Sequence, residues 1–456
     1  MPDYTPHTDE ELSAMLAFLD LSSLDELFDA IPKALQLQNG LELAQGQSEP
    51  DVLADMARLA SRNPAAASSM VCFAGGGAYD HEVPPVVRAL AGRSEFVTAY
   101  TPYQPEVAQG ILQAVFEFQT LVSRLAGLPV ANASLYDGAA SVTEAVNLAV
   151  GSSRRQRVLL STGVQPHWRQ VVRTFAKGTG HDIVEVPLGG GKTDFTSVGG
   201  DAPGVVVVAH TTYLGTIDDL AGARAFADEA GAVLVVVADP IMASVLRTPG
   251  SLGADVVVGE GQALGTALSF GGPYLGLFAC TMEQVRRLPG RLVGETLDEE
   301  GRRAYVTTLR AREQDIRREK ATSNVCSNQT LMAVTAAIQL GWLGTNGLAE
   351  VAQRCVSATH YLADRVLAIE GVTPLLPGVP FAREVAVVTP APAAVVIERL
   401  AEAGFLGGLA LDSLTEDGDG SVDPARREHT ILMTATERRT LDEVEGFVAA
   451  LEKAAR

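Results

Sequence analysis

The sequence has few of the residues that mark disulfide-bonded and metal-binding proteins. Its four cysteines, Cys72, Cys280, Cys326 and Cys355, are far apart and form no CxxC pair. Disulfides and a zinc site are therefore not expected. The seven histidines are scattered and include no HExxH motif, so no protein-bound metal is predicted.

Long hydrophobic runs are also missing. The most apolar stretches, residues 205–209 and 232–238, are far shorter than the roughly 18 residues that a membrane helix needs. The N-terminus is acidic and lacks a cationic start followed by an apolar segment. We therefore expect no membrane span, no secretion signal and a cytoplasmic location.

Positive charge is scarce. The chain has 35 lysines and arginines against 55 acidic residues, a net charge of −20. Nucleic acid phosphates would be repelled, so we expect no nucleic acid partner. A hydrophobic content of 47 % excludes a disordered chain, and 456 residues should form more than one domain.

The periodic segments predict a helical lead-in over residues 1–75. Thr8 and Glu11 form a capping box, and Ser23 precedes a second apolar-periodic run that ends at Pro32. The segment from Gly189 to Thr193 resembles the end of a phosphate-binding P-loop. Because Val186 stands where the first glycine is required, we expect a surface hairpin there.

Residues 76–330 predict a large α/β domain. Short runs rich in valine occur at residues 157–161, 183–186, 205–209, 232–238 and 255–258. Several are separated by helical stretches such as 221–230, which is typical of a mostly parallel sheet covered by helices.

Residues 331–456 predict a smaller α+β domain. A long helix to Leu343 is followed by strands at 386–388 and 429–434. The last helix opens with a capping box from Thr440 to Glu443.

Polar side chains crowd into residues 100–109, where they include Tyr100, Tyr103, Gln104, Glu106 and Gln109. Two prolines in this stretch favour an extended segment and then a helix with Glu106 in its first turn. The cluster would lie at the start of that helix. A loop whose tyrosines cap a core is the alternative.

Two other stretches are rich in small residues. Three glycines at 75–77 precede Tyr79, Asp80 and His81, and we interpret them as a second wall of the same site, with an ordinary turn as the alternative. Further on, the turn at Gly138 opens an alanine-rich helix, a pattern that places helix-start amides against an anion.

Lysine is missing where this pattern would need it. In large α/β enzymes that bind pyridoxal phosphate, an aspartate at a strand's carboxyl end pairs with the pyridinium nitrogen, and a lysine past the next strand holds the aldehyde. Asp239 fits the first position. The chain has only Lys33, Lys177, Lys192, Lys320 and Lys453, so no lysine follows the strand at 255–258. The cofactor cannot be anchored here in the usual way.

Six stretches, taken in order, resemble one family. They are Phe73-Ala-Gly-Gly-Gly-Ala-Tyr-Asp-His-Glu-Val-Pro, Thr98-Ala-Tyr-Thr-Pro-Tyr-Gln-Pro-Glu-Val-Ala-Gln-Gly, Leu135-Tyr-Asp-Gly, Leu252-Gly-Ala-Asp-Val-Val-Val-Gly, Ser269-Phe-Gly-Gly-Pro-Tyr and Arg318-Glu-Lys-Ala-Thr-Ser-Asn-Val-Cys-Ser-Asn-Gln. The chain resembles the lysine-less subunit of split glycine decarboxylase, the P-protein of the glycine cleavage system. Glu260 and Ala263 depart from what that family leads us to expect.

The resemblance implies a fold-type-I pyridoxal-phosphate architecture with a degenerate cofactor site at Asp239 and Ala263. The Schiff base would form on a companion, lysine-bearing subunit, and none would form on this chain. Together the two subunits would decarboxylate glycine and pass the aminomethyl group to the lipoyl arm of the H-protein.

The resemblance also implies roles for residues of this chain. Tyr100 and Tyr103 would hold substrate and cofactor, Gln104 would donate to a carboxylate or phosphate oxygen, and Glu106 would orient donors or relay a proton.

The stretch from Lys320 to Gln329 would open a helix, and its Thr322, Ser323 and Asn324 would bind the phosphate of the partner's cofactor, or else the stretch would simply cap a helix at a domain joint. Cys326 is expected to be a small buried residue. Two alternative functions remain open at this point. One is a non-catalytic scaffold for the catalytic subunit, and the other is a self-sufficient pyridoxal-phosphate enzyme that uses Lys320.

Overall fold

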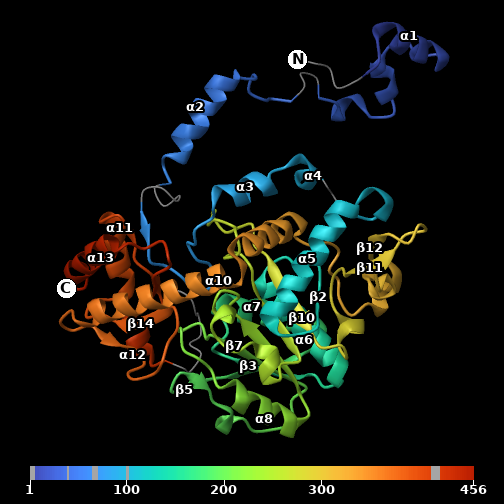
Figure 1. Ribbon diagram of the computed structural model, residues 1–456. Coiled ribbons are helices and arrows are strands. Elements are labelled where there is room, and N and C mark those ends of the chain that lie inside the picture. The colour runs from blue at the N-terminus through green and yellow to red at the C-terminus, as the bar shows by residue number, and fades with distance from the viewer. Residues whose placement is uncertain (1–5, 38–40, 64–69, 99–101, 412–421) are drawn as a thin grey trace. The chain divides into compact units, whose positions relative to one another are not determined.

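The computed structural model describes residues 6–37, 41–63, 70–98, 102–411 and 422–456 (Figure 1). Tyr100, one of the predicted site residues, lies outside the described residues. The chain divides into two compact units, residues 1–63 and 64–456. None of the helices in the described part of the chain is long and apolar enough to cross a membrane.

The first unit consists of short helices. They are α1 (Asp9–Phe18), the 3-10 turns η1 (Leu24–Phe28) and η2 (Lys33–Leu35), and α2 (Glu49–Ala60). The predicted capping box is confirmed, since the Glu11 amide donates to Thr8 Oγ1 at 3.2 Å. The apolar run after Ser23 forms only a 3-10 turn. No described residue of this unit is buried, so the unit has no core of its own.

The second unit is built on a seven-stranded sheet with the order β2-β10-β9-β8-β7-β3-β4. The strands are β2 (Val130–Ala131), β3 (Arg157–Ser161), β4 (Asp182–Val186), β7 (Val205–His210), β8 (Val233–Ala238), β9 (Val256–Glu260) and β10 (Gly276–Cys280). Only β10 pairs antiparallel with its neighbours, and the other ladders are parallel. The five predicted strands and the mostly parallel sheet are thus confirmed.

Side chains along the central strands alternate between the two faces of the sheet, so the core forms two layers. Val206 and Val208 of β7 pack with α5 (Gln109–Ala126), α8 (Leu220–Ala230) and α10 (Thr330–Leu367). Val205 and Val207 point to the opposite face and pack with α6 (Gly138–Ser153) and α7 (Pro166–Thr179). Both faces of the sheet are therefore covered by helices, which explains the continuous valine runs.

A smaller antiparallel sheet with the order β13-β14-β17-β16 lies in the C-terminal part. Its strands are β13 (Thr373–Pro374), β14 (Glu384–Val388), β16 (Leu409–Ala410) and β17 (Thr430–Thr434). Helices α11 (Ala393–Glu402) and α13 (Leu441–Ala454) lie side by side and share its core (Figure 1). Helix α10 contributes to both cores, and its backbone leaves the helical region at Gly344, close to the predicted helix end at Leu343. The division of residues 76–456 into two domains after residue 330 stays a prediction.

The remaining elements are short. They are β1 (Val71–Cys72), α3 (Pro85–Ala91), α4 (Ser94–Val97), η3 (Pro105–Val107), β5 (Leu188–Gly189), β6 (Lys192–Thr193), η4 (Phe195–Ser197), η5 (Met242–Ser244), η6 (Pro249–Leu252), η7 (Val285–Arg287), β11 (Val293–Leu297), β12 (Arg303–Thr307), η8 (Arg310–Arg312), α9 (Gln314–Arg317), η9 (Arg318–Lys320), β15 (Phe405–Leu406) and α12 (Pro424–Arg427). Strands β5 and β6 form the hairpin predicted for Gly189 to Thr193.

Candidate functional site

A cavity opens at the carboxyl ends of β7, β8 and β9, the edge at which open α/β sheets bind ligands. It encloses about 560 Å³ of empty space, part of it open to solvent. Its walls come from the sheet, from the glycine turn at Gly76 and Gly77, from α7, and from the start of β14. Asp239 and Ala263 both line it, and no lysine is among the described residues that do.

Arg383 occupies the part of this cavity next to Asp239. Its Nε and Nη2 atoms donate to Asp239 Oδ2 at 2.6 and 2.5 Å, and its guanidinium carbon lies 3.6 Å from the centre of the Tyr79 ring. The Arg383 side chain is only 2 % exposed. A buried charge requires such pairing, so Asp239 and Arg383 hold each other in place.

The turn after β7 brings Arg383 to this position. The Ala382 amide donates to Gly215 O at 2.9 Å, directly before Arg383 in the chain. Gly215 has a φ of +86°, and a Cβ there would lie 2.0 Å from Glu384 O. The close approach of β14 to the large sheet therefore requires glycine at this position.

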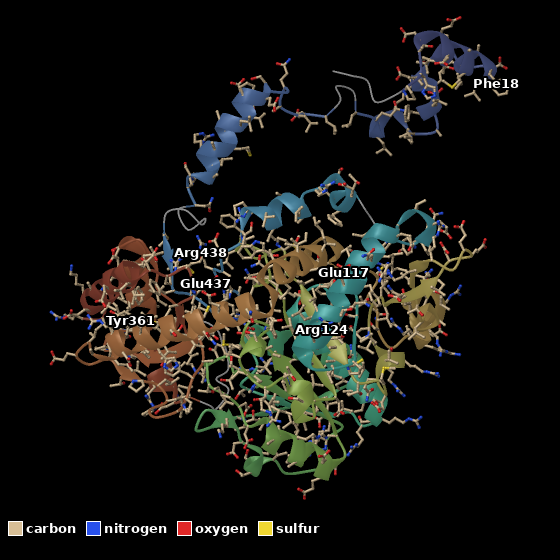
Figure 2. The ribbon with its side chains drawn as sticks, viewed as in Figure 1. Phe18, Glu117, Arg124, Tyr361, Glu437 and Arg438 are labelled. Carbon is tan, nitrogen blue, oxygen red and sulfur yellow. The ribbon has the colours of Figure 1, made fainter. Side chains whose placement is uncertain are left out.

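The network continues from Arg383 to a buried histidine. Arg383 Nη1 lies 2.7 Å from His81 Nε2, and His81 Nδ1 lies 2.8 Å from Glu437 Oε2. Since arginine has no acceptor, Nε2 must accept and Nδ1 must carry the proton that it donates to Glu437. Burial opposes ionisation of Glu437, but the hydrogen bond from His81 prevails and lowers its pKa to about 2. Glu437 lies in the C-terminal part beside Arg438, which pairs with Asp80 (Figure 2).

His81, Glu437 and Cys355 form a group of metal-ligand type, with ligand atoms within 4.8 Å of one another. Both His81 nitrogens are already engaged, and burial raises the pKa of the Cys355 thiol to about 12. A protonated thiol beside a cationic Arg383 suits a hydrogen-bond network better than a cation.

Carboxylates occupy the start of α6, where the sequence predicted an anion. The Gly138 amide donates to Glu260 Oε2 at 2.8 Å, and the Ala140 amide donates to Asp137 Oδ1 at 2.6 Å. Glu260 Oε1 also accepts from the amides of Gln262 and Leu275. Burial raises the pKa of Glu260 to about 7, although these amides favour its charged form.

The glycine stretch lines this cavity rather than the surface around Tyr103. The Gly76 amide donates to Glu384 Oε1 at 2.6 Å, and burial raises the pKa of Glu384 to about 7. Tyr103, Gln104 and Glu106 are not among the described residues lining the cavity. Gly75 and Gly76 pack against β14, β16 and β17. The interpretation of residues 75–81 as a wall of the Tyr103 site stays a prediction.

Tyr103 belongs to a second, exposed group. Its hydroxyl accepts from Arg291 Nη2 at 3.0 Å, and its ring lies beneath the guanidinium groups of Arg291 and Arg310, with ring centre to Cζ distances of 5.1 and 5.9 Å. Gln104, which precedes η3, and Glu106 within it are both exposed. A 3-10 turn with Pro105 at its start and Glu106 in its first turn forms where the helix was predicted. The α-helix itself begins at Gln109, whose side chain bonds Tyr305 O and N and joins α5 to β12.

Arg291 joins this group to the segment 321–329. Its Nη2 donates to Cys326 O at 2.9 Å, and its Nη1 lies 3.4 Å from Asn328 Oδ1. The Cys326 amide also donates to the Tyr136 hydroxyl at 3.2 Å. Two of the family-like stretches therefore meet at Arg291. No local motif in the sequence marks this residue.

The stretch from Lys320 to Gln329 leads into a helix as expected, since α10 begins at Thr330 with Gln329 as its N-cap. Thr322, Ser323 and Asn324 lie before that helix and are not part of its first turn. The segment is instead irregular and anchored by side chains, as shown by Ser323 Oγ accepting from the Val325 amide at 3.1 Å. Cys326 is exposed rather than buried, since its carbonyl rather than its thiol faces Arg291.

This sheet, with a ligand-type cavity at its carboxyl edge and a smaller α+β part beside it, defines a fold-type-I pyridoxal-phosphate-enzyme architecture. Two distant structures show the same fold. They are the sphingosine-1-phosphate lyase of Burkholderia pseudomallei, with a TM-score of 0.63 and 16 % identity over 93 % of this chain and 94 % of that one, and a NifS-like protein from Rickettsia africae, with a TM-score of 0.62 and 10 % identity over 84 % and 99 %.

The chain belongs to the family of glycine cleavage system P-proteins, whose model matches residues 2–375. It is 45 % identical over 452 residues, 98 % of each chain, to the "Probable glycine dehydrogenase (decarboxylating) subunit 1" of Moorella thermoacetica. It also resembles a crystal structure of glycine decarboxylase (P-protein) in inhibitor-bound form. That structure is 44 % identical, has a TM-score of 0.89, and is matched over 99 % of this chain and 100 % of the other.

The cavity does not fit pyridoxal phosphate. Ala263 stands where a lysine would be needed, Asp239 is already paired with Arg383, and the start of α6 is covered by Glu260.

Proposed function

We propose that this chain is the subunit of glycine decarboxylase that does not hold the cofactor and that acts with a second, lysine-bearing subunit. The observation that carries the proposal is a cavity at the carboxyl edge of the sheet that lacks a lysine, in a chain of the P-protein family. Relatives at 45 % and 43 % identity bear the name subunit 1, which supports a second subunit.

The reaction is the decarboxylation of glycine, with transfer of the aminomethyl group to the lipoyl arm of the H-protein. Pyridoxal phosphate held by the second subunit would supply the electron sink for the pair that the departing carboxylate leaves on the glycine α-carbon. This chain supplies side chains that shape and close that site.

The group around Tyr103 is suited to this task. Tyr103 is 51 % exposed and Val107 is 82 % exposed. Gln104 and Glu106, in the same turn, are exposed as well. Polar and apolar groups presented together, with the tyrosine ring held by two arginines, suit a surface that a partner covers.

Within this surface, Tyr103 would contact substrate and cofactor, and Gln104 would donate to a carboxylate oxygen of glycine. Glu106 would orient neighbouring donors. Tyr100 is proposed to act with them on the basis of the sequence alone.

Thr322, Ser323 and Asn324 are proposed to face the phosphate of the partner's cofactor. Thr322 and Asn324 are exposed, and the segment is joined to Tyr103 through Arg291. Arg310 and Arg291, both beside the Tyr103 ring, add positive charge to this group.

Lys320 does not support a self-sufficient enzyme. It is exposed in η9 and is not among the described residues that line the cavity. A Schiff-base lysine has to lie at the cofactor site.

Co-purification of this chain with the lysine-bearing subunit tests the proposal, with glycine–bicarbonate exchange as the readout. Tyr103→Phe should lower the exchange rate at least roughly tenfold while the complex still forms. Tyr361→Phe is the matched control, because Tyr361 also bonds a side chain, that of Glu445, but on the C-terminal half of α10 (Figure 2). Unchanged exchange in the Tyr103 variant would favour a scaffold that does not touch substrate.

A further inference from the structure

The first turn of α6 resembles a helix N-terminus that binds phosphate, but carboxylates of this chain already occupy its amides. In this fold a helix N-terminus at the carboxyl edge of the sheet supplies amides to an anion. Here the Gly138 amide is used by Glu260, and the Ala140 amide is used by Asp137. A phosphate at this position would compete for these donors and meet two carboxylates.

Glu260 is fixed in this place from both sides. Its Oε1 accepts from the Gln262 amide at 2.9 Å and from the Leu275 amide at 2.8 Å, and the residue is only 9 % exposed. These bonds tie the end of β9 to β10 and to the first turn of α6. Displacement of the carboxylate would leave three amides without their partner, which is costly in a buried site.

The position of the pyridinium ring nitrogen is taken as well. Asp239 Oδ2 accepts two bonds from Arg383, and Asp239 Oδ1 accepts from the amides of Ile241 and Met242 at 2.9 and 3.3 Å. A ring nitrogen could reach Asp239 only by moving Arg383 away from the Tyr79 ring.

We propose that Glu260 and Arg383 actively exclude pyridoxal phosphate from this chain's own cavity, with Glu260 in the place of the phosphate and Arg383 in the place of the ring nitrogen. Three features then prevent pyridoxal phosphate from binding in this cavity: the missing lysine, Glu260 and Arg383. The inference deepens the proposed function, on which it rests only in assigning the cofactor to the partner.

The test introduces a lysine at position 263. Ala263→Lys is combined with Glu260→Ala, and each purified chain is incubated with pyridoxal phosphate, reduced with borohydride and digested, so that peptide mass shows any pyridoxyl group at position 263. The unchanged chain, with its five lysines, gives the background. We expect no label at 263 with Ala263→Lys alone, and label with a roughly tenfold or greater gain in apparent affinity when Glu260→Ala is added.

A comparison of pyridoxal phosphate with pyridoxal isolates the phosphate. Both aldehydes should label Ala263→Lys equally poorly, and only the phosphate form should gain from Glu260→Ala. Glu384→Ala is the matched control, because Glu384 is also a buried carboxyl of the cavity but bonds Gly76 instead of Gly138. Arg383→Leu, added last, should increase labelling by both aldehydes.

Three results would overturn the proposal. One is efficient labelling of the single Ala263→Lys variant. Another is an equal gain from Glu384→Ala. The third is a Glu260→Ala, Ala263→Lys chain that unfolds cooperatively in urea yet binds no better than Ala263→Lys alone. Because the measurement uses this chain alone, its failure is distinct from a loss of glycine–bicarbonate exchange in the complex.

Discussion

Arg383 and Asp239, 144 residues apart in the sequence, form a buried ion pair with a shortest N to O distance of 2.5 Å. The pair joins the carboxyl end of β8 to the start of β14. It therefore connects the large sheet to the C-terminal sheet within the cavity at the carboxyl edge of the large sheet.

Arg383→Met should destabilise the chain by about 3–5 kcal/mol, because it leaves the Asp239 carboxylate buried without a counter-charge. The double variant Asp239→Asn, Arg383→Met should recover much of this loss. Urea unfolding of the purified chain measures both. A single variant within about 1 kcal/mol of the unchanged chain would contradict the assigned role of the pair.

Stability should fall as the pH rises from about 5 to 8. Burial raises the pKa of Glu384 and of Glu260 to about 7, above the value of 4.5 that a free glutamate has. The folded chain binds these protons more tightly than the unfolded chain, so their contribution is full below pH 4.5 and is lost as the pH passes 7. Urea unfolding should show a loss of roughly 1–3 kcal/mol over this range.

Glu384→Gln should make that pH dependence about half as steep, because the amide has no proton to lose while Glu260 still titrates. Glu350→Gln, at an exposed ion pair with Arg354, is the control and should leave the slope unchanged. Glu437 acts in the opposite sense, since its pKa of about 2 makes its contribution disappear as the pH falls below 4.5. An unchanged slope in Glu384→Gln would show that Glu384 does not titrate in this range.

Gln119→Leu should cost about 2–4 kcal/mol. Gln119, which is 6 % exposed, donates to Val293 O and accepts from the Val293 amide, both at 2.9 Å, so its loss leaves two buried backbone groups of β11 unpaired. Gln113→Leu on the same helix is the control, because Gln113 bonds only the exposed Glu117. Equal unfolding free energies for the two variants would refute this assignment.

Arg291→Met should lower glycine–bicarbonate exchange by the assembled enzyme at least roughly tenfold, since it releases Tyr103 and the segment 326–328 together. Arg286→Met, at an exposed arginine of η7, should have no effect. Urea unfolding and co-purification separate a positioning role from a loss of folding or assembly. Full exchange in the Arg291 variant would show that Tyr103 and the segment 326–328 take no part in the active site.

Local patterns were sufficient to predict the sheet and the two helix starts that carry capping boxes. The valine runs of β7 and β8 and the capping boxes at Thr8 and Thr440 depend on neighbours in sequence, so they could be recognised there. The missing lysine was equally visible. These features identify the fold and the degenerate site.

The contents of the cavity could not be predicted, because they depend on contacts between distant segments. No sequence motif marks Arg383. It reaches Asp239 because glycine at position 215 lets β14 approach the large sheet closely. Glu260 was recognisable only as an unexpected residue after a strand. Similarly, the bonds from residues 326–329 to Tyr136, Ala133 and Ser134 hold the segment before α10 in place, and no local pattern shows them.

Borohydride reduction of the assembled two-subunit enzyme, followed by mass measurement of each chain, tests most directly whether this chain is the half that holds no cofactor. We predict that the second subunit gains one pyridoxyl group and that the mass of this chain stays unchanged. A pyridoxyl group on Lys320 or on any other of its five lysines, at full occupancy, would contradict that claim.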